Sequence, residues 1–141
     1  MLAIVGFGNH VKKNVLPALD KMPDVTISYV VVRDVNKYAS TYPLNFINDL
    51  DLVLKDTSVK YIYIATPISS HFEIAKKAIL ANKHVLCEKV LTPCETETNT
   101  LIKLAEENNV MLGEVVMYFY HKQFNWLLQN IDSLDLGKLR K

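Results

Sequence analysis

Short apolar runs alternate with amphipathic stretches along most of this chain. Runs rich in β-branched residues predict strands at 2–5, 25–32, 61–65, 83–87 and 110–116, with a weaker strand at 45–47. Apolar residues at helical spacing predict helices around 15–22, 49–55, 74–79, 92–105 and 119–131. Because the strand runs are almost continuously apolar, both faces of the sheet are expected to be buried. The alternation predicts an α/β domain with a doubly wound parallel sheet.

The composition limits the classes of partner. The chain has 141 residues, half of them hydrophobic, and a formal net charge of +1. This is enough apolar material for the core of one domain. The charge balance gives no reason to expect nucleic acid or an anionic membrane as the main partner. No apolar run reaches membrane-spanning length, and the first expected strand starts too early to leave room for a signal peptide.

The two cysteines favour a reducing compartment. Cys87 and Cys94 show no metal-ligand spacing relative to each other or to a histidine pair, so no metal site is expected. Thiols that are neither paired nor metal-bound are typical of cytosolic proteins. We therefore expect a cytoplasmic protein.

The first predicted strand ends on two spaced glycines, Gly6 and Gly8, ahead of a helix. A strand, a glycine turn and a helix N-terminus together present bare backbone N–H groups to a phosphate. Glycine suits this place because a side chain would keep the pyrophosphate of a dinucleotide away. The alternative is a plain turn, since short glycine pairs also occur without any ligand.

Candidate chemistry also follows the second strand, at Arg33 and Asp34. An acidic residue at this point accepts the ribose hydroxyls of NAD, whereas an arginine suits the 2′-phosphate of NADP. Val32 falls at the acidic position and Arg33 just beyond it, which favours NADP slightly over NAD. Surface ion pairing is the alternative role for both charged residues.

Two further strands end on polar residues. Ala65-Thr66-Pro67 leads into a helix that contains His71, and Glu88-Lys89 follows the strand at 83–87. The carboxyl ends of parallel strands meet at one edge of a sheet, so these residues are expected near the glycine turn. A lysine there can donate to a substrate oxygen that gains charge. A packing role for His71 and an exposed ion pair for Glu88-Lys89 are the alternatives.

Four features, taken in order, carry a resemblance to a known family: Gly6-x-Gly8, Leu16-Pro17-Ala18-Leu19, Ala65-Thr66-Pro67 with His71, and Leu86-Cys87-Glu88-Lys89. The chain resembles the N-terminal Rossmann domain of glucose–fructose oxidoreductase and inositol dehydrogenase (the Gfo/Idh/MocA family) over nearly its whole length. The resemblance implies NAD(P)-dependent hydride transfer to or from a small sugar-like or cyclitol-like substrate.

The resemblance also implies roles for single residues. The pyrophosphate turn would consist of Gly6, Phe7, Gly8, Asn9 and His10. Ala65, Thr66, Pro67 and His71 would pass beside the ribose and nicotinamide, and Glu88 would hold the nicotinamide ribose. Lys89 would lie near the transferred hydride, so Lys89 and His71 are the predicted catalytic residues. Arg33 is the predicted contact of the 2′-phosphate, on its position after the second strand and not on the resemblance.

One departure from the family concerns the residue after Lys89. Family members have proline there, often after a cis bond, and this chain has Val90. A cis bond before valine costs about 2.5–4 kcal/mol, so we expect Lys89 to point differently.

The other departure is length. Family members continue into a second α/β domain that supplies most substrate contacts, so residues 1–133 are expected to form the dinucleotide-binding domain and 134–141 the start of a truncated or missing second one. Such a chain would bind dinucleotide but turn over poorly, and its aromatic stretch at 119–131, expected to pack against the sheet edge, would be open to a second copy or another partner chain. A non-catalytic dinucleotide sensor and a remnant that binds nothing are the alternative functions.

Overall fold

The computed structural model describes residues 1–134 and residue 137, and its strands form one parallel sheet. The six strands lie in the order β3-β2-β1-β4-β5-β6. Their bounds are β1 Leu2–Val5, β2 Ile27–Val31, β3 Phe46–Ile47, β4 Tyr61–Ile64, β5 His84–Glu88 and β6 Leu112–Val115. The direction of winding reverses between β1 and β4, where doubly wound sheets bind their ligands. The predicted fold class is confirmed.

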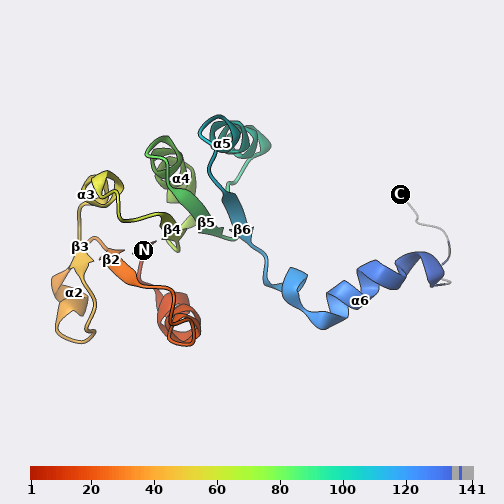
Figure 1. Cartoon of the computed structure of the whole chain (residues 1–141), viewed down its shortest axis with the longest axis horizontal. Coiled ribbons are helices and arrows are strands. Elements are labelled where there is room, and N and C mark those ends of the chain that lie inside the picture. Colours follow the sequence, from red (N-terminus) through yellow and green to blue (C-terminus); the bar gives the residue numbers. More distant parts are fainter. Residues whose placement is uncertain (135–136, 138–141) are drawn as a thin grey trace.

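Helices cover the sheet on both sides (Figure 1). One face carries α3 Leu50–Lys55, α4 His71–Leu80 and α5 Glu95–Glu107, and the other carries α1 Leu16–Leu19, its π-helical extension η1 Val11–Val15, and α2 Asn36–Ala39. Short 3-10 turns are η2 Ile68–Ser70, η3 Met117–Tyr120 and η4 Ile131–Ser133, and α6 is Lys122–Asn130. Each helix-covered face has its own buried apolar cluster.

Local sequence explains where the helices on the first face begin. The Asp49 carboxylate accepts a hydrogen bond from the Leu52 N–H at 3.0 Å, which caps α3 as aspartate does at a helix N-terminus. α5 begins at Glu95, later than predicted, because the Thr92 hydroxyl bonds to the Cys94 carbonyl at 2.8 Å and holds the chain in a turn.

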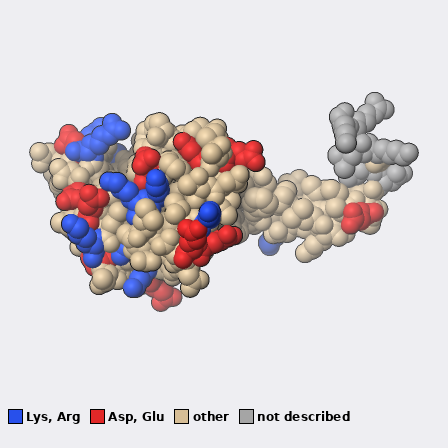
Figure 2. Space-filling model, turned by 90° about the horizontal axis from the view of Figure 1, so that it is seen from above, with Lys and Arg blue, Asp and Glu red and all other residues tan. Residues whose placement is uncertain are grey.

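The helix predicted at 119–131 forms as α6, but the prediction that it packs against the sheet edge is wrong. Figure 1 shows α6 on an arm that leads away from β6, and Figure 2 shows few charged side chains on that arm. α6 buries none of its residues, and Trp126 is 54% exposed. The aromatic rings before the helix pack on one another instead, with the Tyr118 and Phe119 centroids 4.8 Å apart.

The sheet is also incompletely covered on the face of α1. On this face, an apolar cavity of about 510 Å³ lies against β4, β5 and β6. Its lining includes the exposed side chains of Tyr61, Leu86 and Met111. We call this surface the apolar floor. No helix in residues 1–134 is both long and apolar enough to cross a bilayer. Residues 134–141, predicted to be the start of a truncated or missing second domain, lie almost wholly outside the described residues.

The two thiols differ in burial, which leads to a labelling prediction. Burial raises the pKa of Cys87 to about 12, with the charges of Glu88 and Glu114 acting in the same direction, whereas Cys94 is exposed. Because only the thiolate reacts, we expect a thiol reagent at neutral pH to modify Cys94 about 100-fold faster than Cys87. Time-resolved labelling with mass spectrometry measures this, and the C94S variant serves as the control. Two equally fast thiols would contradict the prediction.

Candidate functional site

The two glycines of the turn after β1, Gly6 and Gly8, have different roles. Gly6 has φ +95°, and a Cβ at this position would lie 2.5 Å from the Ala65 carbonyl oxygen. Its N–H donates to the Val31 carbonyl at 2.9 Å, so the turn is packed between its two neighbouring strands. A Cβ on Gly8 would meet no atom within 4 Å. Gly6 is therefore required by the fold, and Gly8 presents its backbone to open space.

That open space is a cavity of about 580 Å³ at the carboxyl edge of the sheet. It spans the point where the winding reverses, since residues after β1, β2 and β4 line it. Seven of the predicted cofactor residues meet here: Gly6, Phe7, Gly8, Arg33, Ala65, Thr66 and Pro67. A glycine turn at the carboxyl edge, where the winding reverses, is the place at which doubly wound domains bind the pyrophosphate of a dinucleotide.

Phe7 offers this cavity mainly its backbone, because its ring is buried. The ring packs edge-on against Tyr38, Tyr42 and Phe46, with centroids 5.0–5.2 Å apart. The Lys12 ammonium sits 4.8 Å from the Tyr38 centroid, over the same rings. This aromatic cluster fixes the outer wall of the turn.

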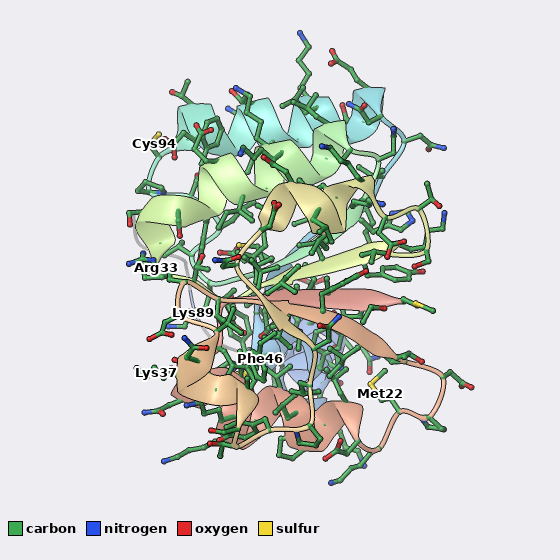
Figure 3. The ribbon with its side chains drawn as sticks, turned by 90° about the vertical axis from the view of Figure 1, so that its left-hand side faces the viewer. Met22, Arg33, Lys37, Phe46, Lys89 and Cys94 are labelled. Carbon is green, nitrogen blue, oxygen red and sulfur yellow. The ribbon has the colours of Figure 1, made fainter. Side chains whose placement is uncertain are left out.

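Two cations line the cavity beside β2. Val32 is buried at the end of the strand, and the exposed side chain of Arg33 follows it. The Asp34 Oδ1 accepts a hydrogen bond from the Lys37 N–H at 3.3 Å, which joins the end of β2 to the first turn of α2. Figure 3 shows Arg33 and Lys37 at one edge of the sheet, opposite Met22. Lys37 was not among the predicted site residues, although its place three residues after Asp34 puts it in the turn that follows β2.

His10 and Glu88 lie apart from this cavity, at the polar end of the apolar floor. The His10 Nε2 is 3.0 Å from Glu88 Oε1, and Asn14 donates to the other ring nitrogen at 3.1 Å. The Tyr63 hydroxyl donates to the same carboxylate oxygen. Burial raises the pKa of Tyr63, and the Glu88 carboxylate raises it further. Both contacts use Oε1, so Oε2 of Glu88 has no partner among residues 1–134.

His71 is 1% exposed and stands behind the cavity, between two loops. Its Nε2 lies 2.8 Å from the Thr66 carbonyl, and its Nδ1 lies 2.9 Å from the Val90 carbonyl. Both ring nitrogens are thus turned to the backbone, and neither is left for a substrate.

Lys89 is exposed at the same edge of the sheet as Arg33 (Figure 3). Within residues 1–134 no carboxylate pairs with its ammonium. The Lys89–Val90 peptide bond is cis, contrary to the expectation drawn from the valine. Asn9 is exposed and lines neither cavity. Over the described part of the chain, no cluster of His, Cys, Asp and Glu side chains has the geometry to hold a metal ion.

Comparison with known proteins bears on this site. Residues 1–115 match the family model GFO_IDH_MocA, described as "Oxidoreductase family, NAD-binding Rossmann fold". The chain is 25% identical to a dTDP-3,4-didehydro-2,6-dideoxy-alpha-D-glucose 3-reductase of Saccharopolyspora spinosa, over 99% of this chain and 43% of the relative. It is 32% identical to the uncharacterized oxidoreductase YhhX of Escherichia coli, over 97% of this chain and 40% of YhhX.

A solved structure shows the same fold. KijD10, a 3-ketoreductase from Actinomadura kijaniata determined with NADP and TDP-benzene, superposes with a TM-score of 0.85 at 24% identity, covering 99% of this chain and 44% of that one. The chain thus spans about two fifths of the length of the relatives it matches.

Proposed function

Because this chain belongs to the Gfo/Idh/MocA oxidoreductase family, we propose that it is the nucleotide-binding part of an NAD(P)-dependent oxidoreductase. The substrate is a small sugar-like or cyclitol-like molecule, a class supported by the dTDP-sugar reductase among the relatives. The observation that carries the proposal is the open space in front of Gly8, in a cavity at the reversal of the winding. When bound, the nicotinamide supplies or accepts the hydride.

In this proposal, different residues at the carboxyl edge contact different parts of the dinucleotide and the substrate. The backbone of residues 6–10 binds the pyrophosphate, with N–H groups that point at it from the start of the helix. Thr66 and Pro67 form the wall beside the ribose and nicotinamide. Glu88 holds the nicotinamide ribose through its free Oε2, and Lys89 donates a hydrogen bond to the substrate oxygen as charge develops there.

The charges beside β2 favour NADP over NAD. Arg33 and Lys37 both line the cavity beside one carboxylate, that of Asp34, whose Oδ1 accepts from the Lys37 N–H. A ribose hydroxyl takes a carboxylate as acceptor, whereas a 2′-phosphate needs cations, and two cations stand here beside one carboxylate. The side chains present here suit the phosphate.

A titration of nicotinamide fluorescence tests the proposal and this preference together. We expect NADPH to bind about tenfold more tightly than NADH, since a charge-assisted hydrogen bond contributes about 1.5 kcal/mol or more. The R33A/K37A double variant should lose that advantage and keep its affinity for NADH. Lys21→Ala, an exposed lysine that lines neither cavity, is the matched control. Absence of binding by the unmodified chain at millimolar dinucleotide would refute the proposed function.

A second candidate is a non-catalytic module that reads the dinucleotide and passes the information to a partner chain or to a second copy. The arm of α6 favours it, because this helix exposes apolar side chains such as Trp126 and Leu128. Replacing Lys89 separates the two candidates: a sensor keeps its biological output in a K89M variant, and an oxidoreductase does not. The two unpaired thiols suit a cytoplasmic location for either function.

A further inference from the structure

We propose that His71 and Glu114 are positioning residues that together fix the turn carrying Lys89. The inference rests on the proposed function, in which Lys89 donates to the substrate oxygen, and adds that the same ammonium contributes to binding the dinucleotide, whose nicotinamide lies beside it. It gives His71 a role through the backbone, in place of the direct catalytic role predicted from the sequence, and it assigns a role to Glu114, which the sequence analysis did not single out.

His71 holds this turn from the side of α4. It is the first residue of the helix, and its imidazole reaches the Val90 carbonyl with one nitrogen and the Thr66 carbonyl with the other. A carbonyl oxygen only accepts, so each contact requires a proton on the ring nitrogen. One neutral tautomer ties down the turn after β5, the other ties down the turn after β4, and the imidazolium ties down both. The neutral side chain is therefore bonded to one of the two loops that border the proposed nicotinamide site, and the imidazolium to both.

Glu114 holds the turn from the opposite side. It lies in β6, and its Oε1 accepts a hydrogen bond from the Leu91 N–H at 2.8 Å. A carboxylate bonded to a backbone N–H makes a charge-assisted hydrogen bond, which is about twice as strong as a neutral one. The Val90 carbonyl and the Leu91 N–H belong to the same peptide unit. Side chains from α4 and β6 thus contact both polar groups of one peptide unit, its carbonyl and its N–H. We call this unit the gripped peptide.

The two contacts to the gripped peptide also restrict the backbone of Lys89. The lysine side chain has no ion pair within residues 1–134, so its position depends on the backbone that carries it. The strand β5 fixes that backbone before Lys89, and the gripped peptide fixes it afterwards. A donor held in advance at the place where charge develops needs no reorganisation during the reaction. His71 and Glu114 would supply that preorganisation for Lys89.

A comparison in two backgrounds tests the coupling. NADPH affinity is measured for Glu114→Ala in the unmodified chain and in a chain that also carries Lys89→Met. If Glu114 acts through Lys89, E114A weakens binding about fivefold in the first background and less than twofold in the second. Glu114→Gln keeps an acceptor oxygen and should restore most of the affinity. Glu106→Ala, an exposed glutamate on α5, should change nothing. An equal loss in both backgrounds, or no loss in either, overturns the proposal.

His71 is tested in the same pair of backgrounds. His71→Gln retains one donor and is expected to weaken NADPH binding only with Lys89 present, while His84→Gln, at the opposite edge of the sheet, leaves binding within twofold. His84 is a suitable control because it also contacts the backbone, accepting from the Met111 N–H at 3.0 Å. Thermal unfolding of each variant shows whether it is folded.

A second readout needs no cofactor. Trypsin cleaves after lysine, and it cleaves slowly where the backbone is held in place by hydrogen bonds. E114A should therefore speed cleavage after Lys89 at least fivefold, while cleavage after Lys103 stays unchanged. If the unmodified chain fails to bind NADPH, the proposed function falls and this readout still decides the structural claim. Unchanged cleavage after Lys89 in E114A overturns it.

Discussion

Replacing Gly6 with alanine is expected to lower the free energy of unfolding by about 3 kcal/mol. The new Cβ would lie 2.5 Å from the carbonyl oxygen of Ala65 and 2.8 Å from its carbonyl carbon, at a backbone φ of +95° that side chains rarely adopt. Both atoms it meets belong to the backbone at the end of a central strand, so neither can rotate away. Chemical denaturation followed by circular dichroism measures the loss.

Gly8→Ala is the matched control for this change. Its Cβ would meet nothing within 4 Å, so we expect a free energy of unfolding within about 0.5 kcal/mol of the unmodified chain. The same methyl group would stand where the pyrophosphate is proposed to bind, and NADPH affinity should fall at least tenfold. A stable G6A variant would contradict our account of the turn. A G8A variant that bound NADPH normally would place the pyrophosphate elsewhere.

Replacing Lys83 with methionine should destabilise the chain by about 2–4 kcal/mol. Lys83 is only 5% exposed, and its ammonium donates to the carbonyls of Asp56 and Val59 at 2.7 and 2.8 Å. Methionine fills similar space but has no donor, so both carbonyls would be left without this partner away from water. The lysine thereby ties the loop after α3 to the start of β5.

Lys60→Met provides the comparison for Lys83, because Lys60 is a nearby lysine with an exposed side chain. We expect it to change stability by less than about 0.5 kcal/mol. Denaturation curves of the two variants measured side by side give the difference. Equal stability of K83M and K60M would show that the buried ammonium contributes no more than a surface one.

The sequence predicted the strands well because they are short apolar runs, although the expected burial of both faces is incomplete where Tyr61 and Leu86 are exposed. The run at 61–65 is apolar throughout and the run at 83–87 ends on three apolar residues, and they became β4 and β5 with small shifts at their ends. The glycine turn and the carboxyl-edge residues could be placed for the same reason, since the position of a strand end follows from the strand.

What the sequence did not predict depends on contacts between distant segments. Helical spacing showed that α6 has an apolar side, but spacing does not say which surface that side meets, and here it meets no part of the sheet. The partners of His71 are backbone carbonyls on two separate loops, which leave no mark on residue type. Glu114 is the one charged residue within 110–116, and that polarity was the only sign in the sequence that could have pointed to a specific role.

The apolar floor has a practical consequence for binding measurements. Dyes that fluoresce on hydrophobic surfaces, such as anilinonaphthalene sulfonate, should bind the native chain at the exposed side chains of Tyr61, Leu86 and Met111. The resulting fluorescence would be mistaken for that of a molten globule. Near-ultraviolet circular dichroism tells the two apart, because the ordered rings around Phe7 give a signal that a loosened core loses. Dye-binding screens of this protein therefore require a near-ultraviolet circular dichroism spectrum of the same sample.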